Sequence, residues 1–159
     1  MIRKMTSEDA TKVLEIYGLG LAARNATFET EIPSWNDWNL KHHQHSRFVY
    51  VHQEIILGWV ALSPVSNRKV YAGVTEVSIY IHPNAQGKGI GSQLMEKVID
   101  NSEKNGIWTL FSSVFPENIA TIKLHEKFGF RIIGKREKIA QLDGIWRDTI
   151  LLERRSKKI

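Results

Sequence analysis

The sequence predicts an α+β protein, with residues 1–159 forming one domain in which a mixed β-sheet carries helices on its faces. Three observations support this prediction. Residues 74–82 alternate and are rich in β-branched side chains, as a strand is. The apolar residues between Ile90 and Ile99 then recur at helical spacing. Near the C-terminus, two strand-like segments flank Asp143-Gly144, a dipeptide typical of a tight hairpin turn.

The remaining elements follow from caps and turns. Thr6 precedes a helical pattern whose apolar stripe includes Val13 and Tyr17, and Ser34 precedes a second short helix. Asn118 begins a further helix. The expected strands are residues 48–51, 55–62, 74–82, 107–114, 130–140 and 145–153, and the two longer C-terminal helices end at Asn105-Gly106 and near Gly129.

Length and composition fit one compact folded domain. The chain is 42% hydrophobic and 25% charged, with a formal net charge of +5. It has no apolar run of about 18 residues, no secretory leader and no cysteine, so we expect a cytoplasmic protein without a membrane span or disulfides. A nucleic-acid partner is not expected, because no basic run is interleaved with the aromatic residues that stacking on bases requires. A basic surface is also suited to a ligand with several phosphates.

A glycine-rich loop joins the central strand to the following helix. Its residues are Gln86, Gly87, Lys88, Gly89, Ile90, Gly91 and Ser92. Glycines permit positive φ angles and close backbone approach, so several N–H groups can converge on an anion at the helix N-terminus. The spacing matches neither the dinucleotide-binding nor the nucleoside-triphosphate loop. The alternative interpretation is an ordinary tight strand-to-helix turn.

A second motif identifies a family. The Q-x-x-G-x-G loop is followed, from Pro116, by P-E-N-x-A-x-x-x-L-H-E-K-x-G-F, and together they resemble the GNAT N-acetyltransferases. The resemblance implies a mostly antiparallel, splayed sheet. It also implies that acetyl-coenzyme A is the co-substrate and that residues 86–92 bind its pyrophosphate. It also implies that backbone N–H groups of Ile79, Tyr80 or Ile81 meet the thioester carbonyl, and that Asn118 touches the coenzyme arm. Asn118 is equally well explained as a helix N-cap.

Further residues narrow the resemblance. Thr27-Phe28-Glu29-Thr30 and Gly144-x-Trp146-x-Asp148, among others, are similar to the phosphinothricin acetyltransferase branch, which includes methionine sulfoximine and methionine sulfone acetyltransferases. This likeness implies transfer of acetyl to the amine of a small amino acid or analogue, and a homodimer. Two alternatives remain open: acetylation of a protein N-terminus or lysine, and a non-catalytic acyl-coenzyme A sensor.

Glu76 is the candidate general base, since it matches the branch's proposed catalytic glutamate and an amine with a pKa of about 8 to 10 is mostly protonated at neutral pH. The alternative is a sheet-face glutamate paired with an arginine. His125 occupies the position where many relatives carry a tyrosine that protonates the leaving thiolate. A histidine can give or relay a proton, but it is also a common packed residue in a helix.

Arg68 matches the branch's pocket arginine, and a guanidinium can hold a substrate carboxylate through two hydrogen bonds. The alternative is a solvated loop arginine. The other expected substrate-binding residues are Phe28, Glu29, Trp59, Tyr71 and Thr75, and Trp146 either closes the pocket or anchors a hairpin. His42, His43 and His45 are the one histidine cluster. Without cysteine or an obvious acidic partner they are interpreted as a solvated helical surface, and no metal site is expected.

Overall fold

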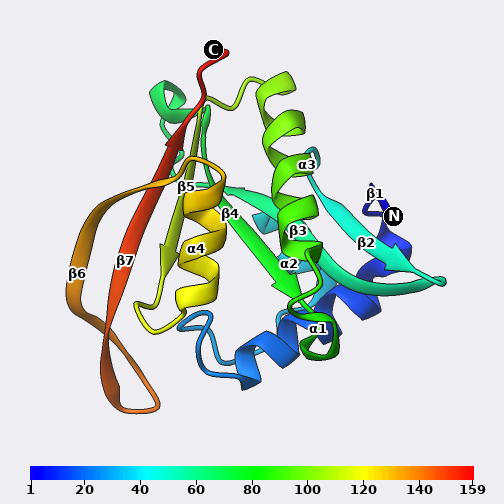
Figure 1. Cartoon of the computed structure of the whole chain (residues 1–159), viewed down its shortest axis with the longest axis horizontal. Coiled ribbons are helices and arrows are strands. Elements are labelled where there is room, and N and C mark those ends of the chain that lie inside the picture. Colours follow the sequence, from blue (N-terminus) through cyan, green and yellow to red (C-terminus); the bar gives the residue numbers. More distant parts are fainter.

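The computed structural model describes residues 1–159, and its elements are drawn in Figure 1. The strands are β1 (Ile2–Lys4), β2 (Phe48–His52), β3 (Ile55–Pro64), β4 (Val74–Ile81), β5 (Thr109–Val114), β6 (Arg131–Leu142) and β7 (Ile145–Arg155). The α-helices are α1 (Ala10–Ala22), α2 (Trp35–Lys41), α3 (Ile90–Lys104) and α4 (Ile119–Lys127), and the short 3-10 segments are η1 (Ser7–Asp9), η2 (Lys69–Tyr71) and η3 (Pro83–Ala85).

The strands form one mixed sheet in the order β1-β2-β3-β4-β5-β7-β6. Every neighbouring pair is antiparallel except β4 and β5, which are parallel. The predicted α+β class and the mostly antiparallel sheet are therefore confirmed. Strand β1 was not predicted, because three residues are too short to show an alternating pattern.

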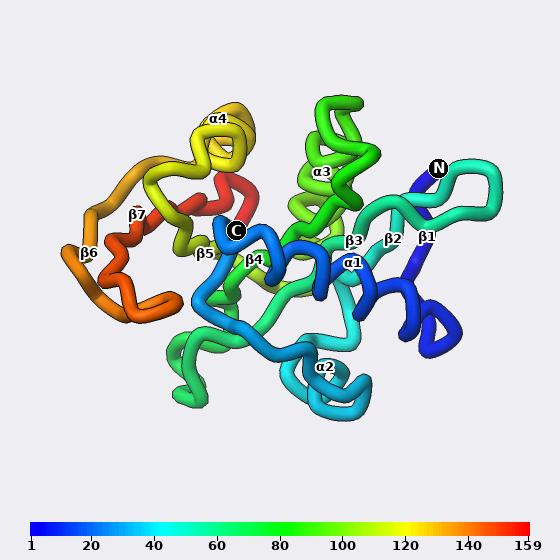
Figure 2. The backbone as a smooth tube through the Cα atoms, turned by 90° about the horizontal axis from the view of Figure 1, so that it is seen from below, coloured from blue at the N-terminus to red at the C-terminus, as the bar shows by residue number.

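Helices cover both faces of the sheet, with α3 and α4 on one side and α1 and α2 on the other (Figure 2). Strand β3 is buried on both faces. Its residues Val60 and Leu62 join the core under α3, whereas Trp59 and Ala61 join the core under α1 and α2. Because side chains alternate along a strand, those of β4 also point alternately to the two faces of the sheet. Val77 packs toward α3, so Glu76 and its even-numbered neighbours face α1 and α2.

The predicted caps are present. Thr6 N–H donates to the Asp9 carboxylate at 2.8 Å in a capping box, and the Ser34 hydroxyl accepts from the N–H of Asp37 at 3.1 Å. Asp143 and Gly144 both have positive φ, 52° and 77°, as the tight hairpin turn between β6 and β7 requires. No helix has both the length and the apolar character needed to cross a bilayer.

The functional feature of the sheet is a split between its two parallel strands. β4 and β5 pair only over Val74–Glu76 and Thr109–Phe111. Beyond Glu76 the strands separate, so the rest of β4 has backbone groups without a partner on that side. The split begins at the residue predicted to be the general base.

Candidate active site

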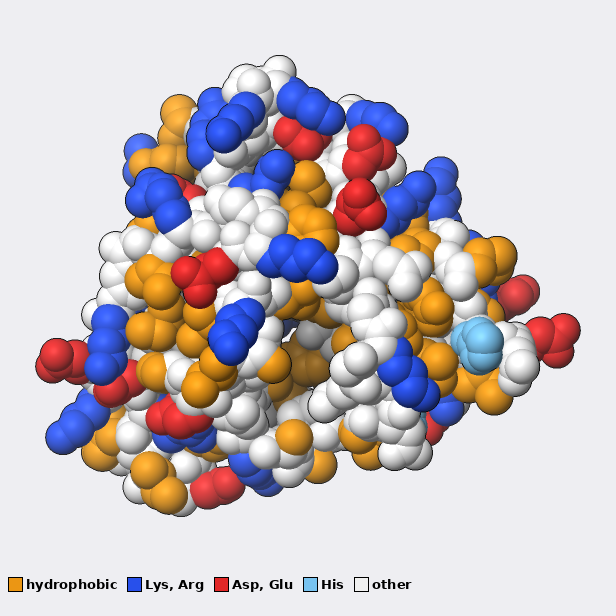
Figure 3. Space-filling model, in the orientation of Figure 1, with side chains coloured by type: hydrophobic (Ala, Val, Ile, Leu, Met, Phe, Trp, Pro, Cys, Tyr) orange, Lys and Arg blue, Asp and Glu red, His pale blue; other side chains and the backbone are white.

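A cavity of about 510 Å³ opens where β4 and β5 separate. Figure 3 shows the molecule hollowed between α4 and the N-terminal end of α3, with hydrophobic side chains inside and basic side chains around the opening. The cavity is lined by residues of β4, β5, α4, the 26–33 segment, α2 and its C-cap His42, together with Tyr17 of α1, Trp59 of β3 and Thr149 of β7. It is therefore built from segments far apart in the sequence.

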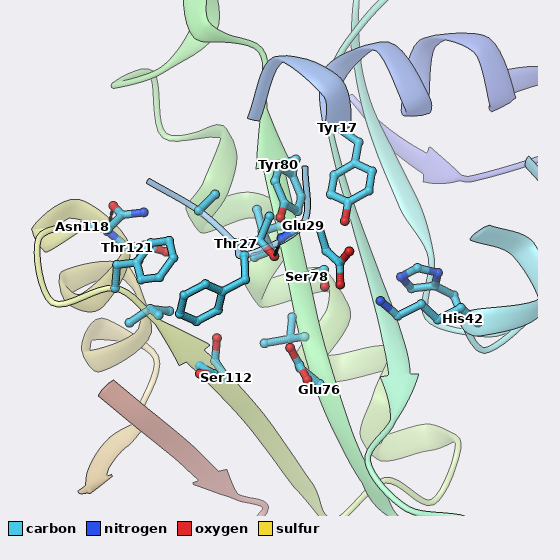
Figure 4. A pocket seen from close by; sticks show the side chains of 18 of the residues that line it. Tyr17, Thr27, Glu29, His42, Glu76, Ser78, Tyr80, Ser112, Asn118 and Thr121 are labelled. Carbon is cyan, nitrogen blue, oxygen red and sulfur yellow. Dashed lines mark hydrogen bonds between the residues drawn. The ribbon is translucent and has the colours of Figure 1, made fainter. Parts of the chain in front are cut away.

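Glu76 lies at the start of the split and lines this cavity (Figure 4). Its carboxylate makes no ion pair and no hydrogen bond, which excludes the alternative of a glutamate paired with an arginine. Burial raises the pKa of Glu76, and the positive charge of Lys41 acts in the opposite direction. A half-buried carboxylate with a raised pKa and free oxygens is suited to accept a proton near neutral pH.

Other acidic and hydroxyl groups line the same cavity as Glu76. Figure 4 shows the Tyr17 hydroxyl and the Glu29 carboxylate directed toward each other, with Ser78 between Glu29 and β4. The pKa of Tyr17 is raised by burial and by the negative charges of Glu29 and Glu76. This part of the cavity has a negative potential, which attracts an ammonium group.

His42 bounds the cavity on the side of α2 and corrects the prediction of a solvated helical histidine cluster. Helix α2 ends at Lys41, so His42 and His45 do not share a helical face. His42 is 8% exposed and its ring stacks on Trp38 with centroids 4.0 Å apart. Nδ1 lies 2.7 Å from Trp38 O, and because a carbonyl only accepts, Nδ1 carries the proton. Burial lowers the pKa of His42 to about 4.

Helix α4 bounds the opposite side through Asn118 and His125. Asn118 is the predicted N-cap: its Oδ1 accepts from Thr121 N–H at 3.3 Å, and its Nδ2 donates to Asn25 O at 3.1 Å. His125 is 4% exposed, its Nδ1 lies 2.7 Å from Thr121 O, and its Nε2 is buried without a partner. Nδ1 therefore carries the proton and Nε2 has a free lone pair. Burial lowers the pKa of His125, so in this state it accepts a proton at Nε2 and does not donate one.

The predicted pocket residues Phe28, Glu29 and Trp59 all line the cavity. Phe28 packs edge-on against Phe115, with ring centroids 5.0 Å apart. The guanidinium of Arg147 lies 4.0 Å from the Phe115 ring centroid and donates to Arg24 O at 3.2 Å. Trp59 is 1% exposed and its indole N–H donates to Val13 O, so it forms part of the cavity wall from within the core.

Three predicted substrate-binding residues do not reach the cavity. Arg68 and Tyr71 are exposed in the β3–β4 connection, where the guanidinium lies 5.4 Å from the Tyr71 ring centroid. Thr75 is fully buried, with its hydroxyl unpartnered, because strand alternation turns it toward the α3 face with Val77. Trp146 is 55% exposed on the β6–β7 hairpin and also lies outside.

The glycine-rich loop lies beside the cavity as an exposed turn. Gly87 and Gly89 have φ angles of 76° and 78°, and a Cβ at either would meet nothing within 4 Å. Among the backbone hydrogen bonds of the turns, loops and caps, none has a donor N–H from residues 86–92. Ile90 is 3% exposed, so only its backbone is available to a ligand. The loop thus presents free N–H groups at the N-terminus of α3, in the arrangement that binds phosphate.

The backbone N–H groups of the Ile79–Ile81 segment point alternately to β3 and into the split. His82 N–H donates to Leu57 O at 2.8 Å, and the register of β3 with β4 is regular. In an antiparallel pair, the N–H groups of every second residue point to the same neighbouring strand. The N–H of Tyr80 therefore also points to β3, whereas the N–H groups of Ile79 and Ile81 point into the split. Tyr80 contributes its ring instead, stacked on Trp59 with centroids 5.0 Å apart.

Several lining residues were not identified from the sequence. Tyr17 was assigned to the apolar stripe of its helix. Ser78 could have been identified from the sequence, because it lies two residues after Glu76 and so faces the same side of the strand. Lys41, His42, Ser112 and Thr121 gave no usable signal, because their place in the cavity depends on how distant elements pack.

The acetyltransferase (GNAT) family model matches residues 10–130 of the chain. YwnH of Bacillus subtilis (strain 168), whose assignment as a phosphinothricin acetyltransferase is provisional, is 32% identical over 159 residues, covering 96% of this chain and 97% of YwnH. The phosphinothricin N-acetyltransferase of Streptomyces coelicolor is 26% identical, with coverage of 96% and 94%. The L-methionine sulfoximine/L-methionine sulfone acetyltransferase of Pseudomonas aeruginosa is 28% identical over 98 residues, covering 62% and 57%.

Solved structures have the same architecture. A GNAT superfamily phosphinothricin acetyltransferase from Sinorhizobium meliloti, in complex with AcCoA, superposes with a TM-score of 0.90 at 25% identity, covering 98% of this chain and 87% of that one.

Proposed function

The chain belongs to the acetyltransferase (GNAT) family, and we propose that it transfers acetyl from acetyl-coenzyme A to the α-amine of a small amino acid or amino-acid analogue. Methionine sulfoximine, methionine sulfone and phosphinothricin are the first candidates, because curated relatives are named for them. The single observation that carries the proposal is Glu76, an unpaired carboxylate at the start of the β4–β5 split.

The coenzyme fits the residues present. The free N–H groups of the 87–91 loop are suited to its pyrophosphate, and a Cβ at Gly87 or Gly89 would occupy open space beside them. The split leaves the N–H groups of Ile79 and Ile81 available to the pantetheine arm and the thioester carbonyl. Acetyl-coenzyme A supplies an activated acyl group when bound.

Glu76 then has a defined task. It accepts a proton from the substrate ammonium, directly or through a water, so that the amine nitrogen bonds to the acetyl carbon as the carbon–sulfur bond breaks. The nitrogen loses its second proton as the amide forms, and the departing thiolate takes up that proton. His125 lines the cavity, but with its proton on Nδ1 it must first be protonated at Nε2 to act as the acid.

A panel of acceptors tests the proposal. Thiol release from acetyl-coenzyme A is measured with methionine sulfoximine, methionine sulfone, phosphinothricin, ordinary amino acids and lysine-containing peptides. We expect turnover with the amino-acid analogues and little with peptides. Preferential acetylation of peptides would contradict the proposal, and coenzyme binding without any turnover would favour a sensor.

We also propose a homodimer. β6 is an edge strand of 12 residues, and the hairpin that it forms with β7 exposes Ile132, Ile133, Ile139, Ile145 and Trp146. Light scattering is expected to give twice the chain mass of 18.3 kDa. A fully active monomer would contradict this proposal.

A further inference from the structure

The charges that line the cavity are strongly unequal. Four carboxylates face it, those of Glu29, Glu31, Asp37 and Glu76, and one residue among its lining is a lysine or arginine, Lys41. His42 and His125 also line the cavity, but burial lowers the pKa of each and keeps them uncharged at neutral pH. An amino acid brings a carboxylate together with its amine. In a cavity with so many carboxylates, that group needs a cation.

Lys41 is held by a rigid backbone. It is the last residue of α2, and the guanidinium of the buried Arg47 donates to His43 O at 2.6 Å, to His42 O at 3.0 Å and to Asn39 O at 3.2 Å. The stack of His42 on Trp38 fixes the next residue in the chain. The end of α2 is thereby fixed, while the Lys41 side chain itself forms no ion pair.

The position of Lys41 also suits the geometry of the substrate. In an α-amino acid the amine and the carboxylate are attached to the same carbon, so a carboxylate anchor has to lie close to the general base. Lys41 and Glu76 line the same cavity, and the positive charge of Lys41 acts to lower the pKa of Glu76 against the larger effect of burial. Arg68 exerts no such effect and lies outside the cavity, with its guanidinium over Tyr71.

We propose that Lys41 binds the substrate carboxylate and so selects amino acids over simple amines, an inference that rests on the proposed acetyl transfer to amino acids. The three exposed acids that line the same cavity, Glu29, Glu31 and Asp37, favour the approach of the ammonium group. Lys41 therefore discriminates between acceptors by their carboxylate and leaves coenzyme binding unchanged.

The experiment compares methionine sulfone with its methyl ester, which keeps the amine and loses the negative charge. In Lys41→Met we expect KM for methionine sulfone to rise about tenfold or more, the usual loss for a hydrogen bond to a charged group, with little change for the ester. KM for acetyl-coenzyme A should stay the same. Lys41→Arg should keep most of the preference for the acid, since it keeps the charge.

Arg68→Met is the matched control, because it removes a cation from the exposed β3–β4 connection and not from the cavity. It should leave the acid-to-ester ratio of kcat/KM unchanged. Added salt should raise KM for the acid in the wild type and much less in Lys41→Met, because screening weakens only an interaction that is still present. Thermal unfolding verifies that the variants are folded, as the exposed position of Lys41 leads us to expect.

Two outcomes would overturn the inference. Equal losses for acid and ester in Lys41→Met would mean that the lysine supports the cavity without contacting the carboxylate. A selective loss for the acid in Arg68→Met and none in Lys41→Met would assign the anchor to Arg68. Failure of the wild type to acetylate any amino acid would instead refute the proposed function, and this inference with it.

Discussion

Replacing Glu76 with glutamine removes the proton acceptor and keeps the shape of the side chain. The carboxylate has no ion pair and no hydrogen bond, so the substitution breaks no other interaction. The expected loss of activity is therefore the loss of proton transfer alone. An α-amine with a pKa of about 9 is roughly 1% neutral at pH 7, and a variant that must wait for the neutral amine should turn over about 10²-fold more slowly.

Stability should change in the opposite direction. The pKa of Glu76 is raised by burial, so folding favours the protonated form and ionisation at neutral pH costs stability. This cost is present above the folded-state pKa and disappears as the pH falls below the unfolded value. At pH 7 the Glu76→Gln protein should be at least as resistant to thermal unfolding as the wild type. Loss of turnover without loss of stability separates catalysis from a folding defect.

The assay is the pH dependence of kcat with methionine sulfone, measured by thiol release at saturating acetyl-coenzyme A. The rate of Glu76→Gln should rise about tenfold per pH unit toward the amine pKa and approach that of the wild type there. Coenzyme affinity, measured by calorimetry, should be unchanged. Turnover equal to wild type at pH 7 would refute the reasoning and leave positioning alone to account for the reaction.

The remaining predictions concern the coenzyme loop and the buried residues near α2. Gly89→Val should abolish detectable coenzyme binding in calorimetry, whereas Gly106→Val, which has the same φ of 78° and equally open space, should fold similarly and bind normally. The pKa of His42 is about 4 in the folded protein, below the unfolded value of about 6.5. Its contribution to the free energy of unfolding, about 3 kcal/mol, is therefore complete above pH 6.5 and is lost as the pH falls toward 4. In denaturant unfolding, the free energy of unfolding should depend less on pH in His42→Gln than in the wild type, and an equal pH dependence would contradict this. Arg47→Met should lower the free energy of unfolding by about 2–4 kcal/mol, because it leaves buried carbonyl groups without hydrogen-bond donors. A loss below about 1 kcal/mol, measured by denaturant unfolding, would mean that water replaces the guanidinium.

Local patterns predicted the elements well because their causes are local. The strand over β4, the caps at Ser34 and Asn118, and the turn at Asp143-Gly144 each depend on residues within one or two turns of chain. The same holds for the glycine loop, whose positive φ angles follow from Gly87 and Gly89. Short β1 is the exception, since it is a strand only because β2 pairs with it.

The cavity was predicted less completely. Glu76 and Phe28 were found through family motifs, and both line it. The resemblance also nominated Thr75, but strand alternation turns its side chain to the opposite face of the sheet, where it is buried. His42 was interpreted as part of a solvated helical surface because no cysteine or acidic partner accompanied the histidines, whereas the helix ends one residue earlier and the ring stacks on Trp38.

The sequence by itself determined the order of the helices and of every strand except β1, the glycine-rich loop and the family, because each depends on short runs of residues with a recognisable pattern. The tertiary structure decided which charges face one another. The split of β4 from β5 beyond Glu76, and the packing of α2 that brings Lys41 to the same cavity, arise from contacts between segments more than thirty residues apart. The free energy that fixes such contacts comes from burial of the whole core, and no local pattern records it.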